Sequence, residues 1–491
     1  MNINELKNKI LQLAIQGKLV PQDENDIPAS VLLEEIKKEK EQLIKEKKIK
    51  KEKPLPEITE EEKLFEIPKG WEWVRLADIT HSLLLNDGDW ILSENMCEAD
   101  EVKLIQLGSI GFGEFIYKGY KNISEQTFID LKCKEIDKGD ILINRLLGKK
   151  LYACILPEIE GKKITSVDTC FIKPNKKIYN SKYLMYVFLS DYFQKVVFGK
   201  IGGTTRQRIS KGNLITIAFP FPSVAEQQRI VQKVDELFEI IDELSKNKEA
   251  MLKNISDTRN KVLQLAIQGK LVEQKPEDTP ASILLEEIRK EKEKLIKEKK
   301  IKKEKPLPEI TEEDKLFEIP KGWEWVRLGN IANIIMGQSP DSSYVSEDKN
   351  GIEFHQGKTA FGKKILDKSG LFCEKPTKVA EAGDILLSVR APVGAVNFTD
   401  REVCIGRGLT AIRAINNKDN RFIFYIIKAL EKELIGKATG TTFLAISSKE
   451  IKELVMPLPS VEEQLRIVKK VDEIMAYLDE LEKTILNDSI I

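Results

Sequence analysis

The chain has 491 residues, of which 79 are Lys or Arg and 79 are Asp or Glu, so its formal net charge at neutral pH is zero. That length allows two or more domains, each with its own core. The sequence has neither an apolar run of about 18 residues nor a signal-peptide pattern, so we expect a cytoplasmic protein without a membrane segment. Zero net charge excludes a uniformly basic nucleic-acid binder, yet segments 77–222 and 331–459 are each modestly basic.

Residues 1–20 open the chain with an amphipathic helix that breaks at Gly17, and its apolar positions are Leu6, Ile10 and Leu13. A Pro-Ala-Ser sequence from Pro28 then predicts the start of a second helix, rich in Lys and Glu, whose charged run continues to Pro54. Such a run is typical of a solvated helix with ion pairs four residues apart. A contact with phosphates or with a partner protein is the alternative.

The block from Leu11 to Ile79 returns almost unchanged at Leu263 to Ile331, with about 58 of 69 positions identical. It ends in EIPKGWEWVRL, where Trp71 lies two residues before Trp73, so the two rings point to opposite faces of a strand or turn. We expect one ring of the pair to pack into a core. The block therefore predicts the start of a globular domain rather than a base-stacking platform.

Beyond these blocks the two halves diverge in sequence but keep one outline. Each has short β-type runs, a Gly-Asp-Ile-Leu segment, a helix-like stretch, a Gly-Thr-Thr loop and a Pro-rich exit. Similar frames with divergent inserts predict shared mechanics and two different targets.

Residues 223–272 carry apolar residues at a seven-residue repeat and predict one helix of roughly 60 to 70 Å. A helix of this length needs a partner for its apolar stripe. The C-terminal segment repeats its first half at an offset of 237 residues, and the N-terminal segment repeats its second half at an offset of 252. We therefore predict an antiparallel coiled coil in which Met1 and Ile491 meet at mid-helix.

The predicted fold class is two α/β (α+β) domains in pseudo-twofold arrangement, separated by this long antiparallel helical spacer. The segments are a half helix at 1–20, a charged insert and linker at 21–70, a first domain at 71–222, the central helix at 223–272, a second insert and linker at 273–322, a second domain at 323–459 and a half helix at 460–491.

Several catalytic motifs are missing from the sequence. It has no Asn/Asp-Pro-Pro-aromatic tetrapeptide of a DNA amine methyltransferase and no GxxxxGK[ST] phosphate loop, and it has two histidines only. The six cysteines are scattered without a CxxC pair, so we expect buried thiols and no metal site. Pro340-Asp341 followed by Glu347-Asp348-Lys349 resembles a nuclease motif. Short acidic loops that end in Lys are common by chance, so we do not interpret this one as a catalytic site. We predict a non-catalytic protein.

Two clusters suit the recognition of DNA. The loop from Gly203 to Arg208 combines a flexible backbone, hydroxyls and guanidiniums, and Gln and Arg can pair bidentately with adenine and guanine. The candidate DNA-contacting residues are Arg145, Lys149, Thr204, Thr205, Arg206, Gln207 and Arg208 in the first domain, and Gln338, Ser339, His355, Gln356, Lys358, Arg390, Arg407, Thr441 and Thr442 in the second.

This organisation strongly resembles the specificity subunit of type I restriction-modification systems, over essentially the whole chain. The shared features are two variable target-recognition regions, helical spacers in a circular repeat, the Gly-Thr-Thr loops, the IPKGWEWVRL blocks and the P-x-P-x-x-x-x-Q exits at Pro220 to Gln227 and Pro457 to Gln464. The charged inserts at about 28–65 and 280–317 depart from shorter members, which lack them.

The resemblance implies a DNA-binding subunit without its own cofactor, in which each target-recognition domain reads one half of an asymmetric bipartite site. The coiled coil would fix the gap, which suits half-sites separated by roughly one helical turn of 34 to 36 Å. Methylation would require the adenine to leave the stack. A coiled-coil scaffold with two protein-binding heads is the open alternative.

The resemblance also implies partners that defend against foreign DNA. Two modification subunits would carry S-adenosylmethionine and the adenine-N6 methyl-transfer site, and restriction (motor-nuclease) subunits would use ATP and Mg. The spacer residues expected to bind partners are Ile230, Val234, Leu237, Ile241, Leu244, Ile467, Val471, Ile474 and Leu478.

Overall fold

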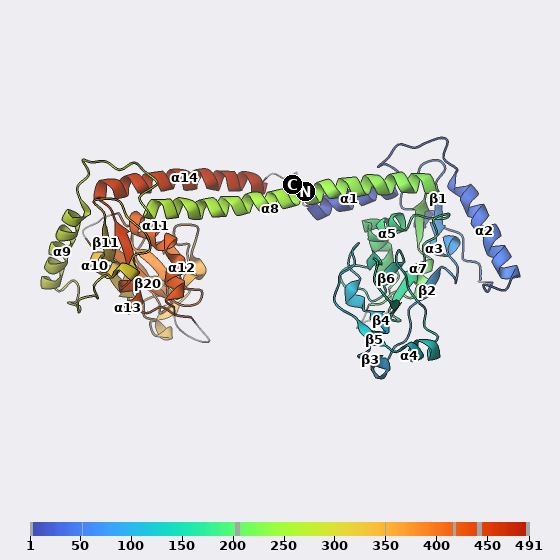
Figure 1. Ribbon diagram of the computed structural model, residues 1–491, viewed down its shortest axis with the longest axis horizontal. Coiled ribbons are helices and arrows are strands. Elements are labelled where there is room, and N and C mark those ends of the chain that lie inside the picture. Colours follow the sequence, from blue (N-terminus) through green and yellow to red (C-terminus); the bar gives the residue numbers. More distant parts are fainter. Residues whose placement is uncertain are drawn as a thin grey trace. The chain divides into compact units, whose positions relative to one another are not determined.

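The computed structural model describes residues 3–51, 53–201, 207–348, 350–415, 419–438 and 444–487. The chain divides into two compact units: unit 1 is Met1–Lys248 with Ser489–Ile491, and unit 2 is Glu249–Asp488. Both follow nearly the same order of elements, except that unit 1 has a helix at Glu125–Asp130 where unit 2 has a strand at Val379–Ala380 (Figure 1). No helix in the described ranges is long and apolar enough to cross a membrane. The predicted meeting of Met1 with Ile491 lies outside the described residues.

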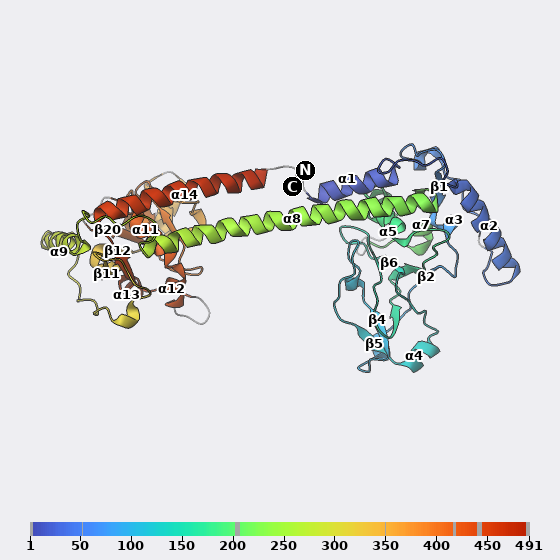
Figure 2. The same cartoon turned by 45° about the horizontal axis from the view of Figure 1, so that its top comes forward.

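In unit 1, helix α1 (Ile3–Ile15) lies along the first part of α8 (Val224–Ile267), as Figures 1 and 2 show. Lys7 pairs with Asp242 at 2.5 Å. Beyond the end of α1, Asp26 pairs with Arg229 at 2.7 Å. Because residue numbers rise along one helix while those of their partners fall along the other, the predicted antiparallel pairing is confirmed here.

In unit 2, α14 (Val461–Asn487) pairs with the second part of α8 in the same antiparallel sense. Arg259 of α8 contacts Asp479 at 2.6 Å and Glu482 at 2.8 Å. The prediction that the central helix reaches residue 272 is wrong. The helix ends at Ile267 because Gly269 adopts a φ of +66°, which an L side chain rarely adopts and which ends helices.

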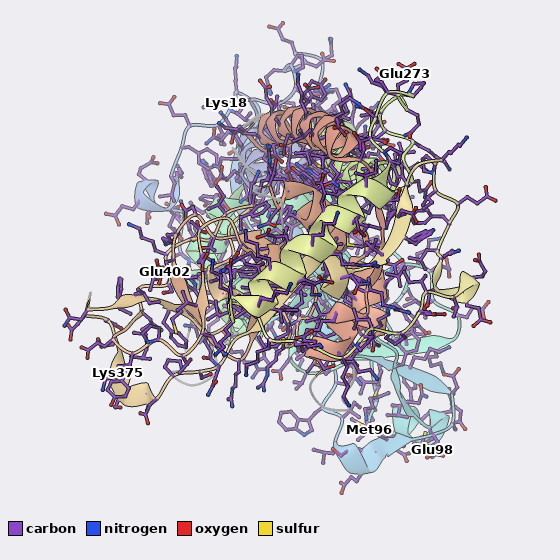
Figure 3. All side chains as sticks on the ribbon, turned by 90° about the vertical axis from the view of Figure 1, so that its left-hand side faces the viewer. Lys18, Met96, Glu98, Glu273, Lys375 and Glu402 are labelled. Atoms are coloured by element: carbon purple, nitrogen blue, oxygen red, sulfur yellow. The ribbon has the colours of Figure 1, made fainter. Side chains whose placement is uncertain are left out.

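The domain of unit 1 consists of three small sheets with the strand orders β1-β10, β2-β9-β6-β7 and β3-β5-β4-β8. The strands are β1 (Glu72–Arg75), β2 (Leu85–Asp87), β3 (Met96–Cys97), β4 (Val102–Ile105), β5 (Lys121–Ile123), β6 (Ile141–Asn144), β7 (Tyr152–Ile155), β8 (Lys162–Thr165), β9 (Thr169–Ile172) and β10 (Ala218–Phe221). The helices are α3 (Leu76–Ile79), α4 (Glu125–Asp130), α5 (Ser181–Leu189), α6 (Asp191–Gly199) and α7 (Lys211–Ile215). In Figure 3, Met96 and Glu98 mark the outer edge of the third sheet.

The domain of unit 2 repeats this plan with the strand orders β11-β21, β12-β20-β17-β18 and β13-β15-β14-β19-β16. The strands are β11 (Glu324–Arg327), β12 (Ala332–Met336), β13 (Val345–Ser346), β14 (Ile352–His355), β15 (Phe372–Cys373), β16 (Val379–Ala380), β17 (Ile385–Ser388), β18 (Val396–Phe398), β19 (Val403–Ile405), β20 (Leu409–Ala414) and β21 (Val455–Leu458). The helices are α10 (Leu328–Ile331), α11 (Arg421–Ala429), α12 (Glu431–Gly436) and α13 (Ser448–Lys452).

A buried hydrogen-bond group ties helix, linker and domain together in each unit. In unit 1, Glu226 of α8 accepts from Trp71 Nε1 at 2.8 Å and from Gln22 Nε2 at 2.5 Å. Trp71 is 5% exposed and Glu226 is 3% exposed. The same contacts recur at the same distances in unit 2 between Trp323, Gln274 and Glu463. The prediction that one Trp of each pair packs into a core is confirmed.

Burial raises the pKa of Glu226 above its usual value of 4.5, although Trp71 and Gln22 donate to the carboxylate. A carboxyl with a raised folded pKa stabilises the fold fully below its unfolded pKa, and this stabilisation is lost as pH rises through the folded pKa. Glu226→Gln keeps an acceptor for Trp71 and removes the titration. We therefore expect the unfolding free energy of E226Q, measured by urea titration, to fall less than that of the unmodified chain as pH rises above 4.5.

Glu463→Gln is the matched variant for unit 2, because burial also raises the pKa of Glu463. Parallel pH profiles for E226Q and the unmodified chain would show that Glu226 does not titrate differently on folding.

The charged inserts form short helices that pack on their own domains. Helix α2 (Ala29–Lys45) buries Ala29 and Ile36, and helix α9 (Ala281–Lys297) buries the equivalent Ala281 and Ile288. The prediction that the charged helix continues to Lys53 is wrong, because the chain turns back at lysines with left-handed backbones. These lysines are Lys47, at a φ of 57°, and Lys299, at a φ of 54°.

The spacer residues predicted to bind partners mostly face the chain's own core. Six of them are at most 7% exposed, and these are Ile230, Val234, Ile241, Ile467, Val471 and Leu478. Leu237 and Ile474 are half-buried, and Leu244 is 38% exposed. For the six buried residues the prediction is corrected, because helix and domain packing within each unit already covers them.

Candidate DNA interface

In unit 2 four of the predicted residues come together where strands end. Gln338 and Ser339 follow β12, Gln356 follows β14, and Arg407 lies in the turn between β19 and β20. The Ser339 hydroxyl donates to Gln356 Oε1 at 3.0 Å and accepts from the Arg407 backbone N–H at 3.4 Å. The side chains of Gln338, Gln356 and Arg407 are exposed. The cluster thus presents amide and guanidinium groups, the donors and acceptors that base edges require.

Close backbone approaches hold this cluster in place. Gly337 donates its N–H to Leu409 O at 2.9 Å, and a Cβ at Gly337 would lie 2.2 Å from Gly406 O. Gly408 donates to Gln356 O at 3.1 Å. The strand ends pack so closely that only glycine fits at position 337. This close packing fixes the direction of the side chains that follow.

Arg390 flanks the same cluster. It is exposed, and the adjacent Val389 donates its N–H to Gly408 O at 2.9 Å. Lys358 is also exposed and lies two residues beyond Gln356. The predicted contacts Thr441 and Thr442 lie outside the described residues.

His355 does not fit the prediction. Its side chain is buried, with Nε2 lying 3.2 Å from Glu353 Oε1, and burial lowers its pKa. Side chains alternate along β14, so His355 shares a face with Glu353. Gln356, just beyond the strand, turns outward instead.

The first-domain predictions fall into two groups. Arg145 is 6% exposed and pairs with Asp87 at 3.1 Å, so it supports the end of β2 and is not free to read bases. Arg208 pairs with Asp168 at 2.9 Å but remains partly exposed, and Lys149 and Gln207 are exposed. Thr204, Thr205 and Arg206 lie outside the described residues.

The matching strand orders of the two units identify further candidate DNA-contacting residues in unit 1, which the sequence analysis did not predict. Gly88 follows β2 as Gly337 follows β12, and a Cβ there would lie 2.3 Å from Ser166 O. Trp90, 67% exposed, therefore occupies the place of Ser339. Gln106 is exposed and follows β4 as Gln356 follows β14. The available signal was a Gln directly after each of two short β-type segments, VKLI and IEFH.

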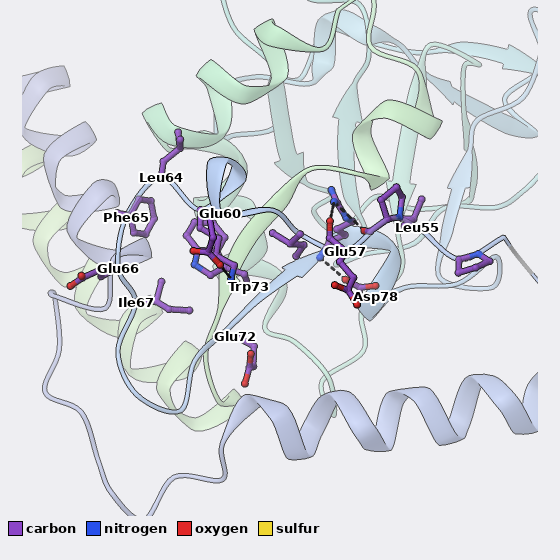
Figure 4. A pocket seen from close by; sticks show the side chains of 15 residues that line it. Leu55, Glu57, Glu60, Leu64, Phe65, Glu66, Ile67, Glu72, Trp73 and Asp78 are labelled. Carbon is purple, nitrogen blue, oxygen red and sulfur yellow. Dashed lines mark hydrogen bonds and ion pairs between the residues drawn. The ribbon is translucent and has the colours of Figure 1, made fainter.

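A groove of about 1020 Å³ lies beside the Trp block of unit 1, and Figure 4 shows the side chains that line it. Its apolar wall includes Phe65 and Trp73, but its lining also carries five carboxylates, from Glu57, Glu60, Glu66, Glu72 and Asp78. None of the predicted DNA-contacting residues lines it. The carboxylates outnumber the two cations of the lining, Lys63 and Arg75, and carboxylates repel phosphates, so the groove is poorly suited to the DNA backbone.

The sequence profile described as the type I restriction modification DNA specificity domain matches residues 68–254 and 320–488. The chain is 31% identical to the EcoAI specificity subunit of Escherichia coli, over 98% of this chain and 90% of that protein. It is 28% identical to the Escherichia coli EcoEI specificity subunit over the same shares.

Two solved structures are similar to most of the chain. One belongs to a study of complex assembly and conformational transition in the type I restriction-modification system, with a TM-score of 0.62, 27% identity and coverage of 86% of this chain and 94% of that one. The other is the HsdS subunit of Thermoanaerobacter tengcongensis, with a TM-score of 0.53, 26% identity and coverage of 86% and 93%. With two DNA specificity domains, each in its own structural unit, this chain belongs to the family of type I restriction-modification specificity subunits.

Proposed function

We propose that this chain selects the DNA of a type I restriction-modification complex and has no catalytic activity of its own. Unit 1 reads one half of a bipartite, asymmetric site and unit 2 reads the other. The EcoAI-like sequence and the missing methyltransferase and phosphate-loop motifs support this assignment. The chemistry then resides in partners that carry S-adenosylmethionine, ATP and Mg.

One observation carries the bipartite proposal. Equivalent strand ends in the two units carry different side chains on the same backbone frame: Trp90, 67% exposed in unit 1, stands where the partly buried Ser339 stands in unit 2. Base recognition depends on the side chains at such positions, while the frame only positions them. Two frames with different side chains are expected to read different bases.

The spacer helices supply surfaces on which modification subunits could dock. The apolar stripe of these helices is already buried within each unit, so docking must use apolar side chains that remain exposed. On α8 and α14 the exposed apolar side chains include Ile240, Leu244, Leu465, Tyr477 and Leu481. Exposed apolar side chains that gather on a helix are common at protein interfaces.

Methylation mapping tests the proposed function. The chain is co-expressed with its cognate modification subunit in a methylation-free host, and N6-methyladenine is located by long-read sequencing. A split motif with a fixed gap is the expected result. A stable complex that leaves the genome unmethylated, and that binds no duplex preferentially, would favour the protein-binding scaffold.

Trp90→Ala is expected to weaken DNA binding through unit 1. An exposed indole of this kind can stack on or wedge against bases, and stacking contributes about 1 to 3 kcal/mol per base. We expect the Kd of the complex for its mapped site to rise by about 5- to 150-fold in fluorescence anisotropy. Leu64→Ala in the acidic groove of the same unit, where another large apolar side chain is 62% exposed, is the control and should leave the Kd unchanged.

A further inference from the structure

A Lys-rich turn comprises the end of helix α9 and the residues directly after it in unit 2. Residues 294–305 contain seven lysines and two glutamates. Glu298 pairs with Lys300 at 2.9 Å and Glu304 pairs with Lys452 at 2.6 Å, so both acids are already engaged. The other exposed lysines of the turn have no ion-pair partner among the described residues, and these are Lys297, Lys299, Lys302, Lys303 and Lys305. The turn therefore concentrates uncompensated positive charge.

The turn is anchored at both ends. On its helix side, Lys292 is half-buried and donates to Gly329 O at 2.6 Å. On its other side, Arg327 donates to Pro308 O at 2.8 Å and to Glu309 O at 2.9 Å. The lysines between these anchors are thus displayed on a fixed scaffold, which reduces the entropy lost when they bind a ligand.

The turn lies toward the recognition cluster of unit 2, which is formed by Gln338, Ser339, Gln356 and Arg407. Lys300 and Lys302 line one depression of about 350 Å³ together with Lys378 and edge strand β12. At about 3.3 Å per residue, the five residues of β12 span roughly 16 Å before the chain reaches Gln338. Next to Lys378, the Thr377 hydroxyl donates to Gln338 O. Basic side chains therefore continue from the turn to the cluster along one sheet edge.

The helix terminus adds an independent observation. Lys299, with its φ of 54°, occupies the position at which glycine usually ends a helix, and Lys47 holds the same conformation in unit 1. A sequence that only had to end the helix would favour glycine there. Both copies keep a cation at the expense of backbone strain.

We propose that the Lys-rich turn of unit 2 binds the phosphates of the DNA duplex beside the bases that this unit reads, and that the turn at Lys45 to Lys51 does the same for unit 1. This inference rests on the proposed function. An ammonium group suits a phosphate and carries no base specificity, so the turn contributes affinity and salt dependence without changing the recognised sequence.

The test uses the full chain in complex with its modification subunits, the duplex mapped by methylation and an unrelated duplex of equal length. In the test variant, Lys297, Lys299, Lys302 and Lys303 are all changed to Gln. We expect binding to both duplexes to weaken by about 10- to 100-fold at physiological salt. The slope of log K against log salt should shrink by about 0.9 for each lost phosphate contact.

The control variant removes four exposed lysines of the same unit that lie outside the turn and outside α14, and these are Lys270, Lys275, Lys321 and Lys368. Equal losses in both variants would reduce the effect to net charge and overturn the inference. An unchanged salt slope with weakened subunit assembly would assign the turn to a protein partner instead. If the unmodified complex shows no preference for the mapped duplex, the proposed function itself is wrong. A defect seen only in the variant concerns the Lys-rich turn alone, so the two failures can be distinguished.

Discussion

Replacing Trp71 with alanine is expected to lower the unfolding free energy of unit 1 by about 3 to 5 kcal/mol, the usual loss when a buried Trp is truncated. The indole is 5% exposed and packs in the core that joins α1, α8 and the domain. Its Nε1 also donates to Glu226, so the variant leaves a buried carboxylate with one donor fewer. Urea unfolding followed by circular dichroism measures the loss.

Trp323→Ala is the matched variant of unit 2 and should show a loss of similar size. Trp73→Ala provides the contrast, because Trp73 is only half-buried and makes ring contacts with Phe65 and Tyr192. A loss for Trp71→Ala no larger than that for Trp73→Ala would contradict the central place we give to the buried hydrogen-bond group.

Replacing Gln356 with alanine is expected to relax base specificity in one half-site only. Its amide oxygen accepts a hydrogen bond from the Ser339 hydroxyl, and this contact fixes the orientation of the amide group. One bidentate contact between an amide and a base contributes about 1 to 3 kcal/mol of discrimination. Binding should be compared across duplexes in which each position of the mapped site is changed in turn.

Gln106→Ala is the corresponding variant of unit 1 and should relax a position in the other half-site. Relaxation of the same position by both variants would contradict the assignment of one unit to one half-site. Loss of affinity without any change in base preference would mean that the amides contact the DNA backbone.

The spacer shows how far a hydrophobic repeat predicts structure. Positions such as Ile230 and Val471 are fully buried, as the seven-residue pattern indicates. Met251 follows the same pattern yet is 55% exposed. A repeat identifies the face that can be buried, but the extent of the partner helix decides which turns are covered, and the segments predicted to cover mid-helix lie outside the described residues.

The candidate recognition residues were harder to predict, because residue type does not reveal the orientation of a side chain. His355 and Gln356 are adjacent polar residues, yet one lies inside the sheet and the other outside it. Trp90 has no counterpart by identity in the second half of the sequence. Only the equivalence of β2 with β12 relates it to Ser339, and that equivalence rests on pairing between strands that are distant in sequence.

The duplicated hydrogen-bond group also bears on how such a chain can evolve. Trp71, Gln22 and Glu226 make the contacts that Trp323, Gln274 and Glu463 make, and they frame inserts that share little sequence. If recombination moved an insert from one unit to the other, the insert would be flanked by the same hydrogen-bond group as before. A single genetic exchange could therefore replace the insert of one unit while the contacts that anchor it are kept.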